Sequence, residues 1–184
     1  DCTAHRVIAV GRLDYQKGFD RLIEAWSIVK EDSEYSDWQL DIFGQGEWKD
    51  MLERMIQEKG LGDSAHINKP TNDIWNEYAR SSMLVMSSHF EGLPMVLIEA
   101  MTCGLPAVTF DFKCGPKDII EDGKNGLLVP EGNVQALAEA MKKLMSDESL
   151  RRKMGTEALK IKEKYAEEAV MSRWIQLFKR LTLK

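Results

Sequence analysis

Cysteine and histidine are scarce in this sequence of 184 residues, which contains three of each. None of the six lies in the close spacing of a zinc motif or of a disulfide framework. They are Cys2, Cys103, Cys114, His5, His66 and His89. We therefore expect no bound metal, no disulfide scaffold and a reducing compartment such as the cytoplasm.

A long apolar run and an excess of positive charge are also missing. No stretch approaches the ~18 consecutive apolar residues of a membrane-spanning helix, so only peripheral contact with the inner face of the cell membrane stays open for the full protein. Thirty acidic residues against twenty-five Lys and Arg leave a formal net charge of −5. Nucleic acid, which requires a basic surface, is excluded as the expected partner. Any phosphate group must be bound by a few well-placed cations.

What the sequence does contain is an alternation of short apolar runs and amphipathic stretches, typical of an α/β domain. Strands are expected at residues 6–10, 38–43, 65–68, 83–87, 106–110 and 126–129. Helices are expected at residues 19–30, 47–58, 74–80, 95–102, 117–121, 134–145, 149–163 and 167–181. The pattern predicts a doubly wound, Rossmann-like parallel sheet of about six strands with C-terminal helices, in one domain over residues 1–184. The chain starts at Asp1 rather than Met, and we expect it to be part of a larger protein.

The loop after the first expected strand carries two cations between glycines. In such sheets the ligand crevice lies beyond the carboxyl ends of the strands, so this loop, residues 11–18, is a candidate site. Arg12 offers a planar fork of donors and Lys17 a point charge, and both suit phosphate oxygens. The alternative is a solvated loop whose cations meet nearby acids such as Asp14 and Asp20.

The segment after the fourth expected strand combines two glutamates with a helix start. Pro94 suits the first helical position, so free amides within residues 92–96 would form an anion site. Glu91 precedes this helix and Glu99 lies inside it, and carboxylates can bind sugar hydroxyls or stabilise a cationic sugar centre. The alternative is that Glu91 favours the helix N-terminus electrostatically while Glu99 faces water.

Three weaker signals also lie after expected strands. Gly44 and Gly46 fit either a phosphate-cradling turn or a plain strand-to-helix turn. The turn at residues 115–116 is either another wall of the crevice or purely structural. His89 has no accompanying carboxylate and nucleophile pattern, so we expect a packed or solvent-facing imidazole rather than a general base.

These segments together carry three spaced motifs: G-R-L-x-x-x-K-G at residues 11–18, F-G-x-G at 43–46 and E-G-x-P-x-x-x-x-E-A at 91–100. In this order they resemble the family-4 retaining glycosyltransferases, and Glu91 and Glu99 match that family's E-x7-E motif. Further matches at residues 104–108, 115–116 and 122–129 extend the resemblance over essentially the whole chain.

The resemblance implies a GT-B fold, in which two Rossmann-like domains face each other across a cleft. This chain is similar to the carboxy-terminal, nucleotide-sugar-binding half, with the acceptor-binding N-terminal domain absent. Arg12 and Lys17 would hold the donor diphosphate and stabilise the charge that grows on it, Glu91 would contact the donor sugar, and Glu99 would bind the ribose. The residues that the resemblance assigns to substrate binding are Gly11, Gly44, Gly46, Asn68, Lys69, Gly92, Leu93, Pro94, Met95, Val96 and Glu99.

The same resemblance implies a metal-independent reaction without a cofactor. The leaving phosphate would itself take the acceptor proton on the front face of the sugar. The implied donor is a nucleotide-diphosphate sugar, with a UDP-sugar favoured, and the implied acceptor is a glycan or a lipid-linked group. The segments at residues 67–74, 88–91 and 114–118 are similar to those of bacterial enzymes that build surface polysaccharides, some with UDP-linked N-acetylhexosamines. Lys69 stands where the family has glycine, which puts the contacts that select the base in doubt.

Three rival interpretations remain. A non-catalytic nucleotide-sugar-binding module or pseudoenzyme would share these motifs. An NAD-dependent oxidoreductase would need G-x-G-x-x-G after the first strand, which residues 11–16 do not provide. A phosphorylase of the same fold would need a pyridoxal-phosphate lysine that nothing in the sequence identifies. Separately, apolar residues at helical spacing in residues 170–181 predict an exposed stripe and a tendency to self-associate.

Overall fold

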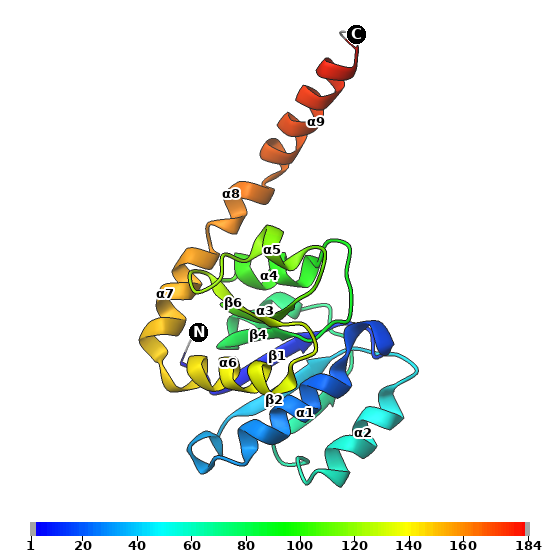
Figure 1. The fold of residues 1–184 in the computed structure, drawn as a ribbon, viewed down its shortest axis with the longest axis vertical. Coiled ribbons are helices and arrows are strands. Elements are labelled where there is room, and N and C mark those ends of the chain that lie inside the picture. Colours follow the sequence, from blue (N-terminus) through cyan, green and yellow to red (C-terminus); the bar gives the residue numbers. More distant parts are fainter. Residues whose placement is uncertain (1–2, 183–184) are drawn as a thin grey trace.

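The structure is a computed structural model that describes residues 3–182, and it contains one six-stranded sheet (Figure 1). The strand order is β3-β2-β1-β4-β5-β6, and every neighbouring pair is parallel. The strands are β1 (Arg6–Val10), β2 (Gln39–Phe43), β3 (Ala65–Asn68), β4 (Met83–Met86), β5 (Ala107–Asp111) and β6 (Gly126–Pro130). The predicted doubly wound, Rossmann-like fold is confirmed, and each strand lies within a residue of its expected bounds.

The strands β4 and β5 are mostly apolar, as expected for strands whose two faces are both covered by helices. Every residue of β4 is buried, and in β5 only Asp111, at the carboxyl end, is partly exposed. Such continuous apolar runs are typical of parallel strands that are buried on both sides.

Helices pack against the two faces of the sheet (Figure 1). The helices α1, α2 and α6 lie on one face, and α3, α4 and α5 lie on the other. Six residues of α1, Leu22, Ile23 and Trp26 among them, form its buried side. The bounds of the helices are α1 Phe19–Lys30, α2 Lys49–Glu58, α3 Ile74–Ala79, α4 Met95–Thr102, α5 Pro116–Ile119, α6 Val134–Ser146, α7 Glu148–Ala158, α8 Ile161–Tyr165 and α9 Glu167–Thr182, and two short 3-10 helices are η1 Tyr15–Lys17 and η2 Ser33–Tyr35.

The order of the strands reverses between β1 and β4. From β1 the chain proceeds outward through β2 to β3, and then it crosses back to β4 and continues in the opposite direction. Connections diverge at this point, and the crevice that they leave beyond the carboxyl ends of the strands is where ligands bind in open α/β sheets. The loops after β1 and β4 therefore meet at the same place.

Two expectations about helices are wrong. Pro94 is the residue before α4 rather than its first helical residue, because its ψ of 88° is not helical. The helix expected at 149–163 is divided into α7 and α8. At the break, Lys160 and Lys162 bond to carbonyls three residues earlier, and this tightening leaves Ala158 and Ile161 buried.

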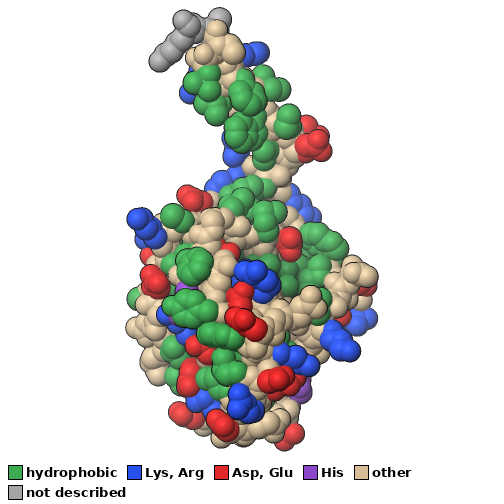
Figure 2. Space-filling view, turned by 90° about the vertical axis from the view of Figure 1, so that its right-hand side faces the viewer, with side chains coloured by type: hydrophobic (Ala, Val, Ile, Leu, Met, Phe, Trp, Pro, Cys, Tyr) green, Lys and Arg blue, Asp and Glu red, His purple; other side chains and the backbone are tan. Residues whose placement is uncertain are grey.

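The last helix projects away from the rest of the molecule (Figure 1). No residue of α9 is buried, although its apolar residues recur at helical spacing. The exposed set is Met171, Trp174, Ile175, Leu177, Phe178 and Leu181, and the apolar surface along this helix is visible in Figure 2. Among the described residues, no helix is both long and apolar enough to cross a membrane.

We expect the chain to self-associate through this exposed stripe, because large apolar patches in contact with water favour association. Sedimentation velocity should show a rising sedimentation coefficient with concentration. Replacing the stacked pair Trp174 and Phe178, whose ring centroids lie 5.7 Å apart, by Gln should shift the protein towards monomer. Lys179→Gln on the same helix serves as the control. A clean monomer over a wide concentration range would contradict the expectation.

Candidate functional site

The loop after β1 is fixed to the end of β4 by backbone contacts. Gly18 has a φ of 58°, and a Cβ atom there would lie 2.4 Å from the carbonyl oxygen of Ser87, so only glycine fits. The hydroxyl of Ser87 donates to the carbonyl of Lys17 at 3.1 Å. The amide of His89 donates to the carbonyl of Gln16 at 2.8 Å. The two loops thus form one rigid unit at the point where the strand order reverses.

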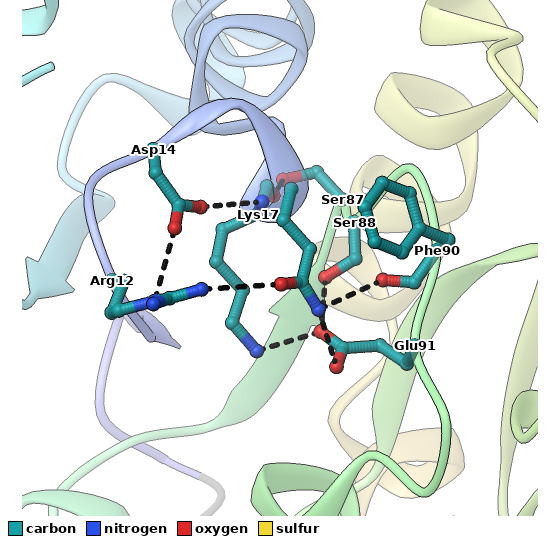
Figure 3. A network of polar contacts seen from close by, with 8 residues as sticks. Arg12, Asp14, Lys17, Ser87, Ser88, Phe90 and Glu91 are labelled. Carbon is teal, nitrogen blue, oxygen red and sulfur yellow. Dashed lines mark hydrogen bonds and ion pairs between the residues drawn. The ribbon is translucent and has the colours of Figure 1, made fainter.

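Lys17 and Glu91 form an ion pair within this unit (Figure 3). The Lys17 Nζ lies 2.6 Å from Glu91 Oε1, and the two side chains are only 17% and 9% exposed. Ser88 Oγ donates to Glu91 Oε1 at 2.9 Å, and Gln16 Nε2 donates to Glu91 Oε2 at 3.2 Å. Three donors from two loops therefore fix the carboxylate of Glu91, and the shielding from solvent strengthens each contact.

Arg12 lies beside this pair but is much more exposed. Its Nε is 3.0 Å from Asp14 Oδ2, and 71% of its side chain is accessible to solvent. Its Nη2 donates to Gln16 Oε1 at 3.3 Å, so Gln16 connects Arg12 to Glu91. An exposed ion pair contributes little free energy, so the guanidinium can leave Asp14 for a stronger anion at small cost. The alternative in which the loop cations meet nearby acids thus applies to Arg12, whereas the partner of Lys17 comes from the other loop.

A pocket of about 360 Å³ opens next to Arg12, beyond the ends of β1 and β2. Gly11 and Gly44 form part of its wall, and a Cβ atom on Gly44 would lie 2.0 Å from the Gly11 carbonyl oxygen. The complete lining is Val10, Gly11, Arg12, Phe43, Gly44, Gln45, Pro70, Thr71, Ile74 and Glu99. Of the predicted site residues, Gly11, Arg12, Gly44 and Glu99 are brought together here.

The N-terminus of α4 has no side-chain cap. Pro94 stands at the cap position, where its side chain offers no acceptor, and its carbonyl accepts a hydrogen bond from the amide of Leu97 at 3.0 Å. The amides at Met95 and Val96 belong to the first turn of the helix, which carries partial positive charge. Gly115, with a φ of 103°, packs its backbone against the ring of Pro94, which indicates a structural role for the turn at residues 115–116.

Asn68 and Lys69 do not line the pocket beside Arg12. The Nδ2 of Asn68 donates to Asp41 Oδ1 at 2.6 Å, and Asn68 lines a separate hollow of about 830 Å³ between α2 and the edge strand β3. Lys69 is exposed. Gly46 packs against the backbone of Leu13, where a Cβ atom would lie 2.3 Å from the carbonyl oxygen. The substrate-binding roles expected for these three residues stay predictions.

The side chains that follow Glu91 point outward or pack internally. Leu93 and Met95 are exposed by 49% and 53%, Gly92 is exposed, and Val96 is half-buried.

His89 stacks on Tyr15 with ring centroids 4.1 Å apart, and burial lowers the pKa of its imidazole. His89 is therefore a packed imidazole, one of the two alternatives that the sequence left open, and its lowered pKa favours the neutral form.

The contacts of three residues in the site were not anticipated from the sequence. Gln16 touches Arg12 and Glu91, Ser88 touches Glu91, and Tyr78 donates its hydroxyl to Glu99. Gln16 and Ser88 adjoin Lys17 and the Glu91 segment in sequence, which is a usable signal. Tyr78 lies on α3, and only the packing of helices against the sheet brings it to Glu99.

Metal binding finds no support in the described part of the chain, residues 3–182. No group of three or more His, Cys, Asp or Glu side chains there could hold an ion. Cys103 and Cys114 are free thiols, and Cys2 lies outside the described residues. That the protein works without a metal or a cofactor stays a prediction.

The chain belongs to the group 1 glycosyl transferase family, whose model matches residues 3–161. The amylovoran biosynthesis glycosyltransferase AmsD of Erwinia amylovora is 38% identical over 170 residues, which are 92% of this chain and 47% of that protein. An exopolysaccharide phosphotransferase of Streptomyces coelicolor is 37% identical over 180 residues, 97% of this chain but 19% of that protein. The chain thus spans about half, or less, of the curated relatives that it matches.

Among solved structures, the chain is similar to TarM of Staphylococcus aureus in a complex that contains UDP and α-GlcNAc-glycerol. The TM-score is 0.90 at 32% sequence identity, and the match covers 96% of this chain and 36% of that one. The resemblance to glycosyltransferases that the motifs indicated is therefore confirmed at the level of the family and the fold.

Replacing Gly44 by Ala tests how tightly the loops after β1 and β2 pack. The new methyl group would overlap the Gly11 carbonyl, so we expect the free energy of unfolding to fall by roughly 1–3 kcal/mol. Chemical denaturation followed by circular dichroism measures this change. Gly62→Ala is the control, because a Cβ there meets only the flexible side chain of Gln57 at 3.2 Å. Equal effects at the two positions would show that the close approach is not needed.

Proposed function

We propose that this chain is the donor-binding domain of a retaining glycosyltransferase. The enzyme moves a hexose or an N-acetylhexosamine from a nucleotide-diphosphate sugar, with a UDP-sugar favoured, to a glycan or lipid-linked acceptor. A further domain of the full protein binds that acceptor. The observation that carries the proposal is the cluster of Arg12, Lys17 and Glu91 at the reversal of the strand order, beside a pocket that contains Glu99.

The arrangement fits a nucleoside diphosphate in size and in charge. The pocket of about 360 Å³ has a largely apolar lining, suited to a base and a ribose, and Glu99 lies in it as the acceptor for ribose hydroxyls. Arg12 lines the pocket, and Lys17 lies further along the same loop, next to Glu91. The uncapped N-terminus of α4 supplies a second source of positive potential for phosphate or sugar oxygens.

The proposed chemistry follows from where charge develops. When the bond between the sugar and the diphosphate breaks, negative charge grows on the diphosphate oxygens. Arg12 and Lys17 therefore stabilise the transition state more strongly than the bound donor before cleavage. For this, Lys17 exchanges Glu91 for phosphate when the donor binds, and Glu91 is free to face the donor sugar near its reacting carbon. The leaving phosphate accepts the proton of the incoming hydroxyl on the same face of the sugar, which retains the configuration.

The relatives support a role in building bacterial polysaccharides. AmsD is named for amylovoran biosynthesis, and the TarM complex contains UDP together with a GlcNAc-linked glycerol. These names favour a UDP-sugar, and N-acetylhexosamine among the sugars. A catalytic role is preferred to a non-catalytic binding module because all four charged motif residues, Arg12, Lys17, Glu91 and Glu99, are present.

Isothermal titration calorimetry with UDP, GDP and ADP tests the proposal. We expect one nucleotide to bind in the micromolar to millimolar range, and Lys17→Ala to weaken that binding about 10- to 100-fold, because a charge-assisted contact to phosphate is lost. Lys59→Ala is a matched control, since Lys59 also pairs with a glutamate, Glu24 at 2.8 Å, but lies outside the crevice.

Equal binding by the Lys17→Ala and Lys59→Ala variants would contradict the assigned role of Lys17. If the wild-type chain binds none of the three nucleotides, the same titration on the full-length protein decides whether the site needs its second domain. Failure there as well would refute the proposed function.

A further inference from the structure

The carboxylate of Glu99 is bound from inside the protein by a tyrosine. The hydroxyl of Tyr78 donates to Glu99 Oε2 at 3.2 Å. Glu99 is half-buried and lines the pocket beside Arg12, whereas Tyr78 is fully buried and is one of the largest such side chains in the core. One residue therefore faces the pocket, and the other lies behind it.

The direction of this hydrogen bond is fixed. Burial, together with the charge of Glu99, raises the pKa of the Tyr78 hydroxyl well above its ordinary value, so the phenol keeps its proton at neutral pH. Tyr78 can then only donate to the carboxylate. An ionised carboxylate has about four acceptor positions on its two oxygens, so several remain after this bond is made.

The helix that carries Tyr78 is itself held in place. Glu77 on α3 forms an ion pair with Arg6 of β1 at 2.7 Å, and the ring of Trp75 packs edge-on against Tyr78 with centroids 6.1 Å apart. Ile74 lies one turn before Tyr78, on the same side of α3, and it lines the pocket. A single short helix thus supplies an apolar wall of the pocket and the hydroxyl behind Glu99.

We propose that Tyr78 is a positioning residue for ribose recognition: its buried hydroxyl holds Glu99 in the orientation that accepts the two hydroxyls of a nucleotide ribose. The inference rests on the proposed function and adds to it a residue that touches no substrate. Without the hydroxyl, the carboxylate of Glu99 loses the donor that fixes its rotamer. Recognition of the vicinal hydroxyls, which needs both oxygens correctly placed, then weakens.

The test compares each nucleoside diphosphate, UDP, GDP or ADP, with its 2′,3′-dideoxy form in calorimetric titrations. We expect the wild-type chain to bind the ribose form more tightly, and Tyr78→Phe to reduce the affinity for that form about 3- to 10-fold. Affinity for the dideoxy form should be unchanged. The dissociation constant of the dideoxy form divided by that of the ribose form therefore falls towards one. The double variant, Glu99→Gln with Tyr78→Phe, should lose little more affinity for the ribose form than Glu99→Gln alone, because Tyr78 acts through Glu99.

Tyr35→Phe is the matched control, because Tyr35 is also buried but lies on η2, outside the crevice. Melting temperatures recorded for both variants separate lost stability from lost recognition. A Tyr78→Phe variant that is less stable but keeps the wild-type ratio would overturn the inference and leave the proposed function intact. Absence of any nucleotide binding in the wild-type and full-length proteins would overturn both.

Discussion

The reversal of strand order between β1 and β4 is the constraint on which the rest of the structure depends. Residues 11–18 and 87–91 are far apart in sequence, but each follows a strand at the same edge of a parallel sheet. The connections leave this point in opposite directions, so a crevice opens beyond the strand ends where residues of both loops meet. The ion pair of Lys17 and Glu91 is formed there.

Close backbone packing gives this unit its rigidity. Gly18 allows the loop after β1 to touch the end of β4, and Gly44 allows the loop after β2 to touch Gly11. Hydrogen bonds from Ser87 and His89 complete the connection between the loop after β1 and the segment after β4. The polar side chains of the site are thus presented by backbone that has little freedom to move, as preorganised recognition requires.

The sequence predicted the parts of this arrangement that depend on local order. Periodicity located the six strands, and motif spacing identified Arg12, Lys17, Glu91 and Glu99. The contacts of Asn68 with Asp41 and of Tyr78 with Glu99 could not be predicted, because they depend on which elements pack together in space. The predicted start of α4 at Pro94 is one residue too early. The preference of proline for the first helical turn takes no account of its contact with Gly115.

The pairing of Lys17 with Glu91 means that this cation carries its own counter-ion within the protein. A free lysine on a surface loop would attract chloride, carboxylates and any other anion in the cell. Here an arriving anion must displace the carboxylate of Glu91, which is shielded from water and also bound by Gln16 and Ser88. Weak, singly charged anions are poor competitors for such a position. The ion pair therefore raises the free energy that any anion must supply to reach Lys17, and an anion that makes several simultaneous contacts supplies it more readily than a singly charged one.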